Sequence, residues 1–260
     1  MSVLHAGPHR LSLLKPLIMG IVNTTPDSFS DGGRWLDAQS AIRHALQLQE
    51  EGADILDVGG ESTRPGAATV SAEEETRRVL PVISELVRQG CVVSVDTKKP
   101  EVMRAALDVA LETVAASAAA VCLMHMQGDP QTMQRVPSYV NVVEEVQFFL
   151  QERVRICEAS GILRERLLID PGFGFGKTLQ HNLELLKHLD RLQVLGIPVL
   201  AGLSRKSFLG QLTGREPGQR EFAGVAAHLI AVAQGARVLR VHQVSAMRDA
   251  LVIWNAVEET

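Results

Sequence analysis

The feature that most restricts the fold is a repeated pattern, in which a short apolar segment ends on a polar residue and a helical segment follows. Seven segments show this pattern and are expected to be strands: residues 17–22, 54–58, 91–95, 121–126, 167–169, 198–203 and 237–241. Strands that alternate with helices over short loops form a parallel sheet covered by helices. The polar residues then gather at the carboxyl ends of the strands, as the catalytic groups of (β/α)8 TIM barrels do.

The length of 260 residues suits one such barrel, and no linker rich in proline or serine divides the chain. Barrels of about 250 residues are ordinary single domains, so we expect one domain over residues 1–260. An eight-stranded barrel nevertheless needs one strand more than the pattern supplies. The fourth strand is missing near residue 110, because residues 97–120 hold a single helical pattern where a helix, a strand and a second helix are expected.

The composition excludes several classes of partner. A formal net charge of -4 leaves no basic footprint for nucleic acid. The N-terminus lacks the apolar core of a signal peptide, and the longest apolar run, residues 113–124, is too short to span a bilayer. Three cysteines without CxxC spacing, in apolar surroundings, are typical of reduced core thiols. We therefore expect a cytoplasmic, enzyme-sized domain that acts on small molecules.

The segment LLIDPGFGFGK, residues 167–177, is the most informative single stretch. A buried strand ends on Asp170, and Pro171 then blocks further strand pairing. The three glycines that follow let the backbone pass close to a ligand. Asp170 is therefore expected at the rim of the sheet, facing a pocket.

Polar side chains also follow the other strands, and all of them are expected to meet in one pocket: Asn23, Asp96, Asp170, Lys206, Arg240 and His242. Any one of them alone would be explained as a strand terminator or a rim ion pair. Six at corresponding positions favour a functional site.

Asp170 and Lys206 can bind one planar heterocycle between them. A carboxylate accepts two hydrogen bonds from an amino-amide edge such as that of a pterin, and an ammonium donates to a ring carbonyl and a ring nitrogen. Two alternatives stay open: a buried ion pair of structural use, and a lysine that forms a Schiff base, as in barrel aldolases.

Arg240 and His242, together with Arg64, form a candidate cationic cup for phosphate groups, although a loop arginine such as Arg64 is often simply solvated. Asn23 can ligate Mg²⁺ through its amide oxygen, with phosphate oxygens and waters completing an octahedral shell. His125 is interpreted as an interior or rim histidine and not as a metal ligand.

With these residues assembled, the sequence is similar to the dihydropteroate synthase family over nearly its whole length. Seven stretches carry the resemblance, in the order of the family: MGIVNTTPDSFSDGG (19–33), DVGGESTRPGA (57–67), SVDT (94–97), LMHMQG (123–128), DPGFGFGK (170–177), GLSRKS (202–207) and RVH (240–242).

The resemblance implies a (β/α)8 TIM barrel, a transferase that joins 4-aminobenzoate to 6-hydroxymethyl-7,8-dihydropterin diphosphate, and usually a homodimer formed through the late helices. It assigns the pterin to Asp96, Asp170 and Lys206, and the diphosphate to Arg240, His242, Arg64 and Mg²⁺ on Asn23. Further substrate-binding positions follow from the motifs, around a site where sulfonamides compete in this family: Thr63, Pro65, Phe29, Phe175, Ser204 and Met124.

The chain departs from the family at two places. After the SVDT helix, relatives carry a strand with an asparagine that binds the pterin, and about 15 residues are absent here by comparison with a full barrel. Either the sequence omits a stretch that the molecule has, or the molecule carries a deletion that opens the barrel. We favour the first explanation, because a deletion would expose two parallel strand edges. Gln243 also replaces an aspartate that is common after the RVH motif.

Two other functions remain as alternatives. A non-catalytic pterin-binding paralogue, or a deletion variant, would explain the lost strand and Gln243. Methyltetrahydrofolate-binding domains share the barrel and a pterin site, but the diphosphate cup at Arg240 and His242 and the TTPDSFSDGG loop argue against them.

Overall fold

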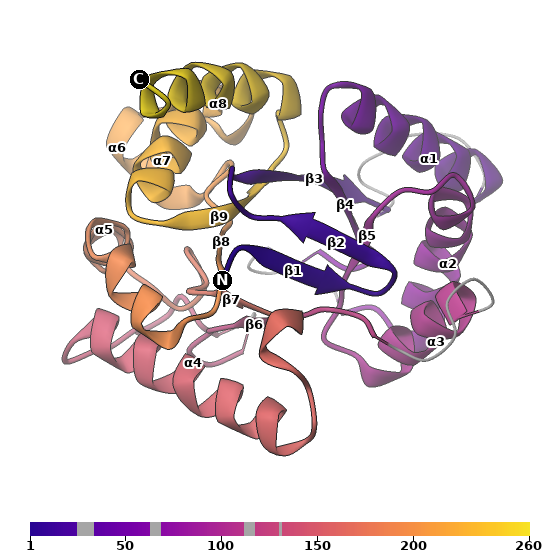
Figure 1. Cartoon of the computed structure of the whole chain (residues 1–260), viewed down its shortest axis with the longest axis horizontal. Coiled ribbons are helices and arrows are strands. Elements are labelled where there is room, and N and C mark those ends of the chain that lie inside the picture. Colours follow the sequence, from indigo (N-terminus) through magenta and orange to yellow (C-terminus); the bar gives the residue numbers. More distant parts are fainter. Residues whose placement is uncertain (25–33, 63–68, 112–117, 130–131) are drawn as a thin grey trace. The chain divides into compact units, whose positions relative to one another are not determined.

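The computed structural model describes residues 1–24, 34–62, 69–111, 118–129 and 132–260 (Figure 1). The chain divides into two compact units, which we describe separately. Unit 1 comprises Met1–Leu17 and Ala118–Thr260, and unit 2 comprises Ile18–Ser117. The expectation of one domain over residues 1–260 stays a prediction.

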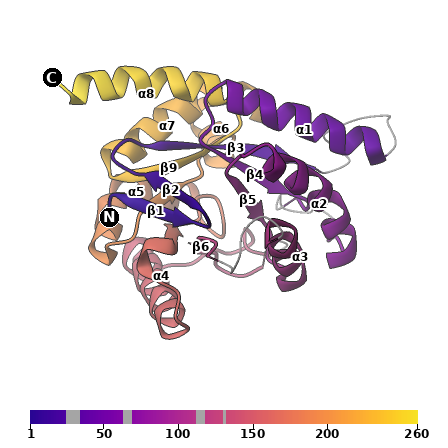
Figure 2. The same ribbon diagram turned by 45° about the vertical axis from the view of Figure 1, so that its right-hand side comes forward.

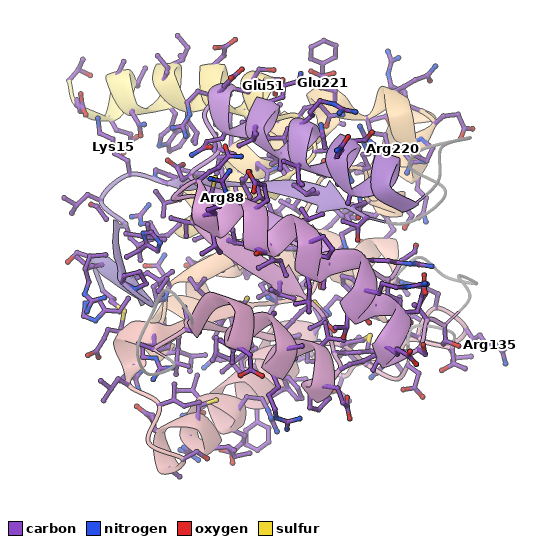
Figure 3. The ribbon with its side chains drawn as sticks, turned by 90° about the vertical axis from the view of Figure 1, so that its right-hand side faces the viewer. Lys15, Glu51, Arg88, Arg135, Arg220 and Glu221 are labelled. Atoms are coloured by element: carbon purple, nitrogen blue, oxygen red, sulfur yellow. The ribbon has the colours of Figure 1, made fainter. Side chains whose placement is uncertain are left out.

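Unit 2 contains a parallel sheet in the order β5 (Val93–Asp96), β4 (Ile55–Gly59), β3 (Leu17–Asn23). Leu17, the first residue of β3, is the one residue of these strands that belongs to unit 1. Three helices accompany these strands: α1 (Arg34–Glu50), α2 (Ala72–Arg88) and α3 (Pro100–Leu111). They lie side by side, α1 against α2 and α2 against α3 (Figures 2 and 3). The side chain of Ser71 accepts a hydrogen bond from the amide of Glu74 and thereby caps α2.

Unit 1 contains four parallel strands in the order β9 (Ala236–Val241), β8 (Val199–Ala201), β7 (Leu167–Asp170), β6 (Val121–Met124). The helices between and after them are α4 (Val142–Ala159), α5 (Leu179–Lys187), α6 (Ser207–Thr213), α7 (Glu221–Ala233) and α8 (Val244–Glu258), with 3-10 turns η2 (Arg164–Arg166), η3 (Leu189–Leu195) and η4 (Pro217–Gln219). Asn141 caps α4, and Thr178 caps α5 in a reciprocal capping box. Side-chain acceptors thus fix where these two helices begin.

All seven predicted strands are present, and within each unit consecutive strands are parallel neighbours, as in a TIM barrel. The sequence analysis missed an antiparallel hairpin, β1 (Val3–Ala6) and β2 (His9–Ser12), which packs on η2 in unit 1. Its strands are only four residues long and largely half-exposed or exposed, so they carry little apolar signal. No helix in the described ranges is both long and apolar enough to cross a membrane.

The burial of β5 and β6 agrees with a missing strand between them. In the described residues no strand lies between these two in sequence, and each is the outer strand of its own unit's sheet. Every residue of β4 and β7 is buried, whereas none in β5 is buried and only Leu123 in β6. Cys122 is exposed, so the expectation that it is a core thiol is wrong, while Cys91 and Cys157 are buried.

Candidate active site

The DPGFGFGK segment is a tight loop whose glycines are required by close contacts. Gly172, Gly174 and Gly176 all have positive φ, at 68°, 78° and 60°. A Cβ on Gly172 would lie 1.8 Å from the backbone oxygen of His125, and one on Gly174 would lie 2.9 Å from Cδ of Lys206. We expected these glycines to give a ligand room. In the structure they admit a neighbouring backbone and the side chain of Lys206.

Asp170 lies at the end of β7 with only 8% of its surface exposed. Its carboxylate accepts a hydrogen bond of 2.7 Å from the amide of Gly172. Burial raises the pKa of this carboxyl, although that hydrogen bond and the positive charges of Lys206, Arg240 and Lys177 oppose the rise. Three predicted site residues, Asp170, Lys206 and Arg240, are therefore close enough to interact electrostatically within unit 1.

Lys206 follows β8 and projects over an aromatic ring. Its Nζ lies 3.9 Å from the centroid of the Phe175 ring, which is a cation–π contact. Met124, the last residue of β6, is the register partner of Asp170 and is 38% exposed. Phe175 thus contacts Lys206, and Met124 lies beside Asp170.

Ser204 and His242 form the second polar group of unit 1. The Ser204 hydroxyl accepts a hydrogen bond of 3.3 Å from the backbone amide of His242 and lies 2.9 Å from Nδ1 of its ring. Arg240 is two residues earlier, on β9, and packs over Gly202. Gln243 is the N-cap residue of α8, but its side chain makes no capping hydrogen bond. The structure brings Ser204, Arg240 and His242 to one strand end.

Two buried side chains, those of Lys177 and His125, support the loop. The sequence analysis assigned no role to Lys177. Lys177 is 3% exposed, and its Nζ donates to the backbone oxygens of Gly172 and Phe175 at 2.9 and 3.1 Å. Nζ also lies 3.0 Å from Nδ1 of His125. Burial lowers the pKa of Lys177 to about 7. Burial also lowers the pKa of His125, and the charge of Lys177 lowers it further, to about 4. His125 is an interior histidine, as predicted.

Unit 2 holds the other described candidates at the ends of its strands. Asn23, Gly59 and Asp96 are register partners on β3, β4 and β5. A Cβ on Gly59 would lie 3.5 Å from that of Asp96, so the glycine leaves the space beside the aspartate open. The described residues contain no cluster of three or more His, Cys, Asp or Glu side chains suited to a metal. Four further candidates lie outside the described residues: Phe29, Thr63, Arg64 and Pro65.

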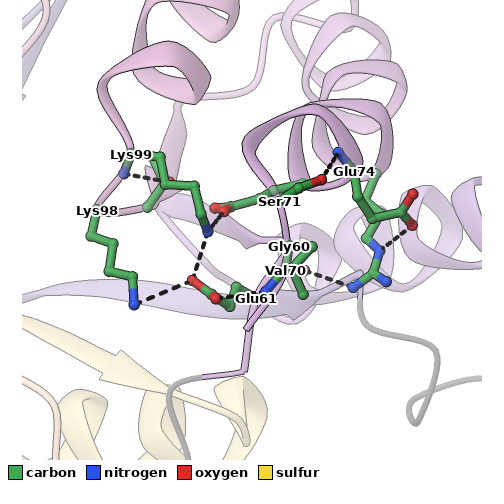
Figure 4. Close-up of polar contacts among 10 residues, drawn as sticks. Gly60, Glu61, Val70, Ser71, Glu74, Lys98 and Lys99 are labelled. Atoms are coloured by element: carbon green, nitrogen blue, oxygen red, sulfur yellow. Dashed lines mark hydrogen bonds and ion pairs between the residues drawn. The ribbon is translucent and has the colours of Figure 1, made fainter. Parts of the chain in front are cut away.

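An ion-pair network in unit 2 joins the residues on either side of the undescribed segment 63–68 (Figure 4). Glu61 accepts a hydrogen bond of 3.0 Å from the amide of Val70 and pairs with Lys99 at 2.8 Å. Lys99 also pairs with Glu75, which is fully buried. Arg78 donates to the backbone oxygen of Gly60 at 3.0 Å. The sequence analysis assigned no role to Glu61 or Lys99, because their pairing depends on the packing of α2.

Curated relatives match almost the whole chain. Dihydropteroate synthase of Neisseria meningitidis serogroup C is 50% identical over 98% of this chain and 97% of its own length, and that of Escherichia coli K12 is 46% identical over 95% and 93%. The first alignment spans 275 columns, although 98% of 260 residues is about 255, so about 20 columns hold no residue of this chain. The second spans 262 columns against about 247 residues, which leaves about 15. Within the aligned regions these relatives are thus about 15 to 20 residues longer than this chain.

Solved structures of dihydropteroate synthases are also similar to this chain, in both fold and sequence. Xanthomonas albilineans dihydropteroate synthase with 4-aminobenzoic acid has a TM-score of 0.92 and 53% identity, covering 100% of this chain and 99% of its own. The complex of that enzyme with 7,8-dihydropteroate has a TM-score of 0.85 and 51% identity, and the match covers 96% of this chain and 97% of its own. Yersinia pestis dihydropteroate synthase in a sulfonamide drug complex has a TM-score of 0.88 and 43% identity, and the match covers 99% of this chain and 100% of its own. The family model described as pterin binding enzyme matches residues 19–242. The chain therefore belongs to the dihydropteroate synthase family of pterin binding enzymes.

Proposed function

We propose that the chain condenses 6-hydroxymethyl-7,8-dihydropterin diphosphate with 4-aminobenzoate, forming 7,8-dihydropteroate and diphosphate. The observation that carries the proposal is the buried carboxylate of Asp170, which lies within the electrostatic field of Lys206 and Arg240 in a chain of this family. An isolated buried carboxylate is costly. A ring that donates hydrogen bonds to Asp170 and accepts one from Lys206 would bind to both groups at once.

The pterin is proposed to lie against Asp170 and Lys206, with Asp96 as a further partner. Its amino-amide edge donates to the carboxylate, and the lysine ammonium donates to the ring carbonyl and a ring nitrogen. Nζ of Lys206 lies over the ring of Phe175, and its charge acts on the carboxylate of Asp170. This arrangement favours the binding role of Lys206 over a Schiff base or a structural ion pair.

Arg240, His242 and Arg64 are proposed to bind the diphosphate. The contacts of Ser204 with both the amide and the ring of His242 fix the orientation of the imidazole. Cationic donors that are already oriented stabilise the charge that grows on the leaving diphosphate without reorganisation. Mg²⁺ would be held by the amide oxygen of Asn23, phosphate oxygens and waters, and when bound it neutralises part of the diphosphate charge.

The second substrate is proposed to bind beside Phe175 and Ser204, with Phe29, Thr63, Pro65 and Met124 as further contacts. Its aromatic amine is already a neutral nucleophile, so it attacks the carbon that loses diphosphate without a strong base. Holding the two substrates in the reacting geometry can supply about 7–11 kcal/mol of the barrier. Sulfonamides are expected to compete for this position.

We also propose a homodimer in the cytoplasm. Exposed apolar side chains on α7 and α8 support an interface there: Phe222, Ile230, Val252, Ile253 and Val257. None of the three cysteines forms a disulfide, which suits a reducing compartment. Size-exclusion chromatography with light scattering should give twice the mass of the chain, whereas a monomer at micromolar concentration would contradict the dimer.

The assay is incubation with both substrates and Mg²⁺, following diphosphate and 7,8-dihydropteroate together. Equimolar release of the two products is expected, with inhibition by a sulfonamide. Folded protein that forms neither product would refute the proposal. The half-exposed strands β5 and β6 favour one alternative, a pterin-binding protein without turnover. Tight binding of the dihydropterin in calorimetry without product would identify that alternative.

A further inference from the structure

The turn that carries Lys206 has an unfavourable backbone conformation. Arg205, the residue before it, has φ of 58°, and it is the one non-glycine residue with positive φ in the described part of the chain. A residue with a side chain avoids this region because its Cβ crowds the backbone. Such a conformation persists only where the surrounding structure holds it.

Arg220 makes the contacts that hold this turn. Arg220, labelled in Figure 3, immediately precedes α7. Its Nη1 donates to the backbone oxygens of Arg205 and Lys206 at 3.1 and 3.3 Å. Its Nε donates to the backbone oxygen of Arg215 at 2.8 Å. One planar guanidinium therefore binds the carbonyl on each side of the Lys206 Cα and anchors itself to a third.

Gly210 makes room for this guanidinium. A Cβ at position 210 would lie 2.2 Å from Nη2 and 2.4 Å from Cζ of Arg220. Gly210 is inside α6, where glycine is less favourable than alanine by about 1 kcal/mol. The glycine is explained by the guanidinium that packs on it, and the two residues form one arrangement with the turn.

We propose that Arg220 is a positioning residue for Lys206: it fixes the strained turn at residues 205–206 and thereby holds Nζ over Phe175, where it meets the pterin. The inference rests on the proposed function for its kinetic consequence, but the clamp itself can be tested without substrate. Lysine cannot replace Arg220 fully, because an ammonium lacks the planar fork that reaches several carbonyls at once.

Limited trypsin digestion tests the clamp directly. Trypsin cuts after Arg205 and Lys206, and the carbonyls at those two bonds are the ones that Arg220 binds. Arg220→Met and Gly210→Ala should each accelerate cleavage at these bonds by about tenfold or more, because the turn opens more often. Arg215→Gln is the matched control, since Arg215 contributes only its backbone oxygen, and it should cleave there at the wild-type rate. Unchanged cleavage in both test variants would overturn the inference.

Kinetics and calorimetry then test the effect on the site. In Arg220→Met the KM for the dihydropterin diphosphate, and the Kd for the pterin, should rise by about tenfold or more, since small misplacement of a binding group is costly. Arg220→Lys should recover part of this loss. A lower melting temperature with unchanged KM and Kd would show a merely structural role and overturn the proposal. If wild-type protein forms no product, the proposed function fails, whereas the trypsin comparison still decides whether the clamp exists. If Arg220→Met does not fold, Gly210→Ala and Arg220→Lys carry both measurements.

Discussion

Acid should destabilise the fold through His228, a buried histidine on α7. Its side chain is 1% exposed. Nε2 accepts a hydrogen bond of 3.2 Å from the amide of Leu203, so Nδ1 carries the ring proton and donates to the backbone oxygen of Gly224 at 2.8 Å. The hydrogen bond from Leu203 is thus accepted only by the neutral ring, whereas the backbone oxygens of Gly224, Ala201 and Arg240 favour the protonated one. A proton on Nε2 would break the bond to Leu203, just before the segment that carries Ser204 and Lys206.

Burial is the main cause that lowers the pKa of His228 from 6.5 to about 4. Because the folded pKa lies below the unfolded value, the unfolded chain binds more protons between pH 4 and 6.5, and stability rises with pH in that window. A shift from 6.5 to about 4, at about 1.4 kcal/mol per unit, corresponds to about 3 kcal/mol. This stability is complete above pH 6.5 and is lost as the pH falls towards 4.

The measurement is the free energy of unfolding by urea, at a series of pH values from 7 to 4, for wild type and His228→Gln. His125 also has a pKa lowered to about 4, but it is present in both proteins and cancels in the difference, as do the carboxylates. Between pH 6.5 and 4 the wild type should lose about 3 kcal/mol more than the variant. Parallel curves would refute the reasoning, whatever the variant's stability at pH 7.

Three further substitutions test other parts of the account. Lys206→Ala should abolish pterin binding in a calorimetric titration while the thermal melt shows an intact fold; retained affinity would contradict its binding role. Lys99→Met leaves the carboxylates of Glu61 and Glu75 without the cation that they share, and it should lower the free energy of unfolding by about 3–5 kcal/mol. Lys98→Gln, which changes an exposed side chain, should alter the free energy of unfolding little. Gly172→Ala should yield unfolded or insoluble protein, because its Cβ meets a backbone oxygen, whereas Gly161→Ala, also at positive φ but with open space, should cost only about 1–2 kcal/mol. Equal losses for the two alanines would show that the clash is absent.

The strands and the polar residues at their ends could be predicted from the sequence, because burial on both faces leaves continuous apolar runs. Residues 167–169 and Asp170 illustrate this: all of β7 is buried and the charge follows directly. The missing strand was also visible, as an interval too short for the expected elements.

The supporting contacts could not be predicted, because they join residues far apart in the chain. Lys177 reads in sequence as a lysine after a glycine-rich loop, and only the fold shows that it is buried against His125. Arg220 likewise lies 14 residues after Lys206, and its role depends on the turn of α6 between them. The short hairpin β1–β2 was missed for a different reason, namely that its residues are too polar and too exposed to form an apolar run.

The most direct test of the account is a crystal structure of this protein with 7,8-dihydropteroate. We expect the pterin ring to be hydrogen-bonded to the carboxylate of Asp170 and to Nζ of Lys206, with Phe175 beside the aminobenzoate portion. A ring bound elsewhere, or Asp170 and Lys206 too far apart to touch one pterin, would contradict it.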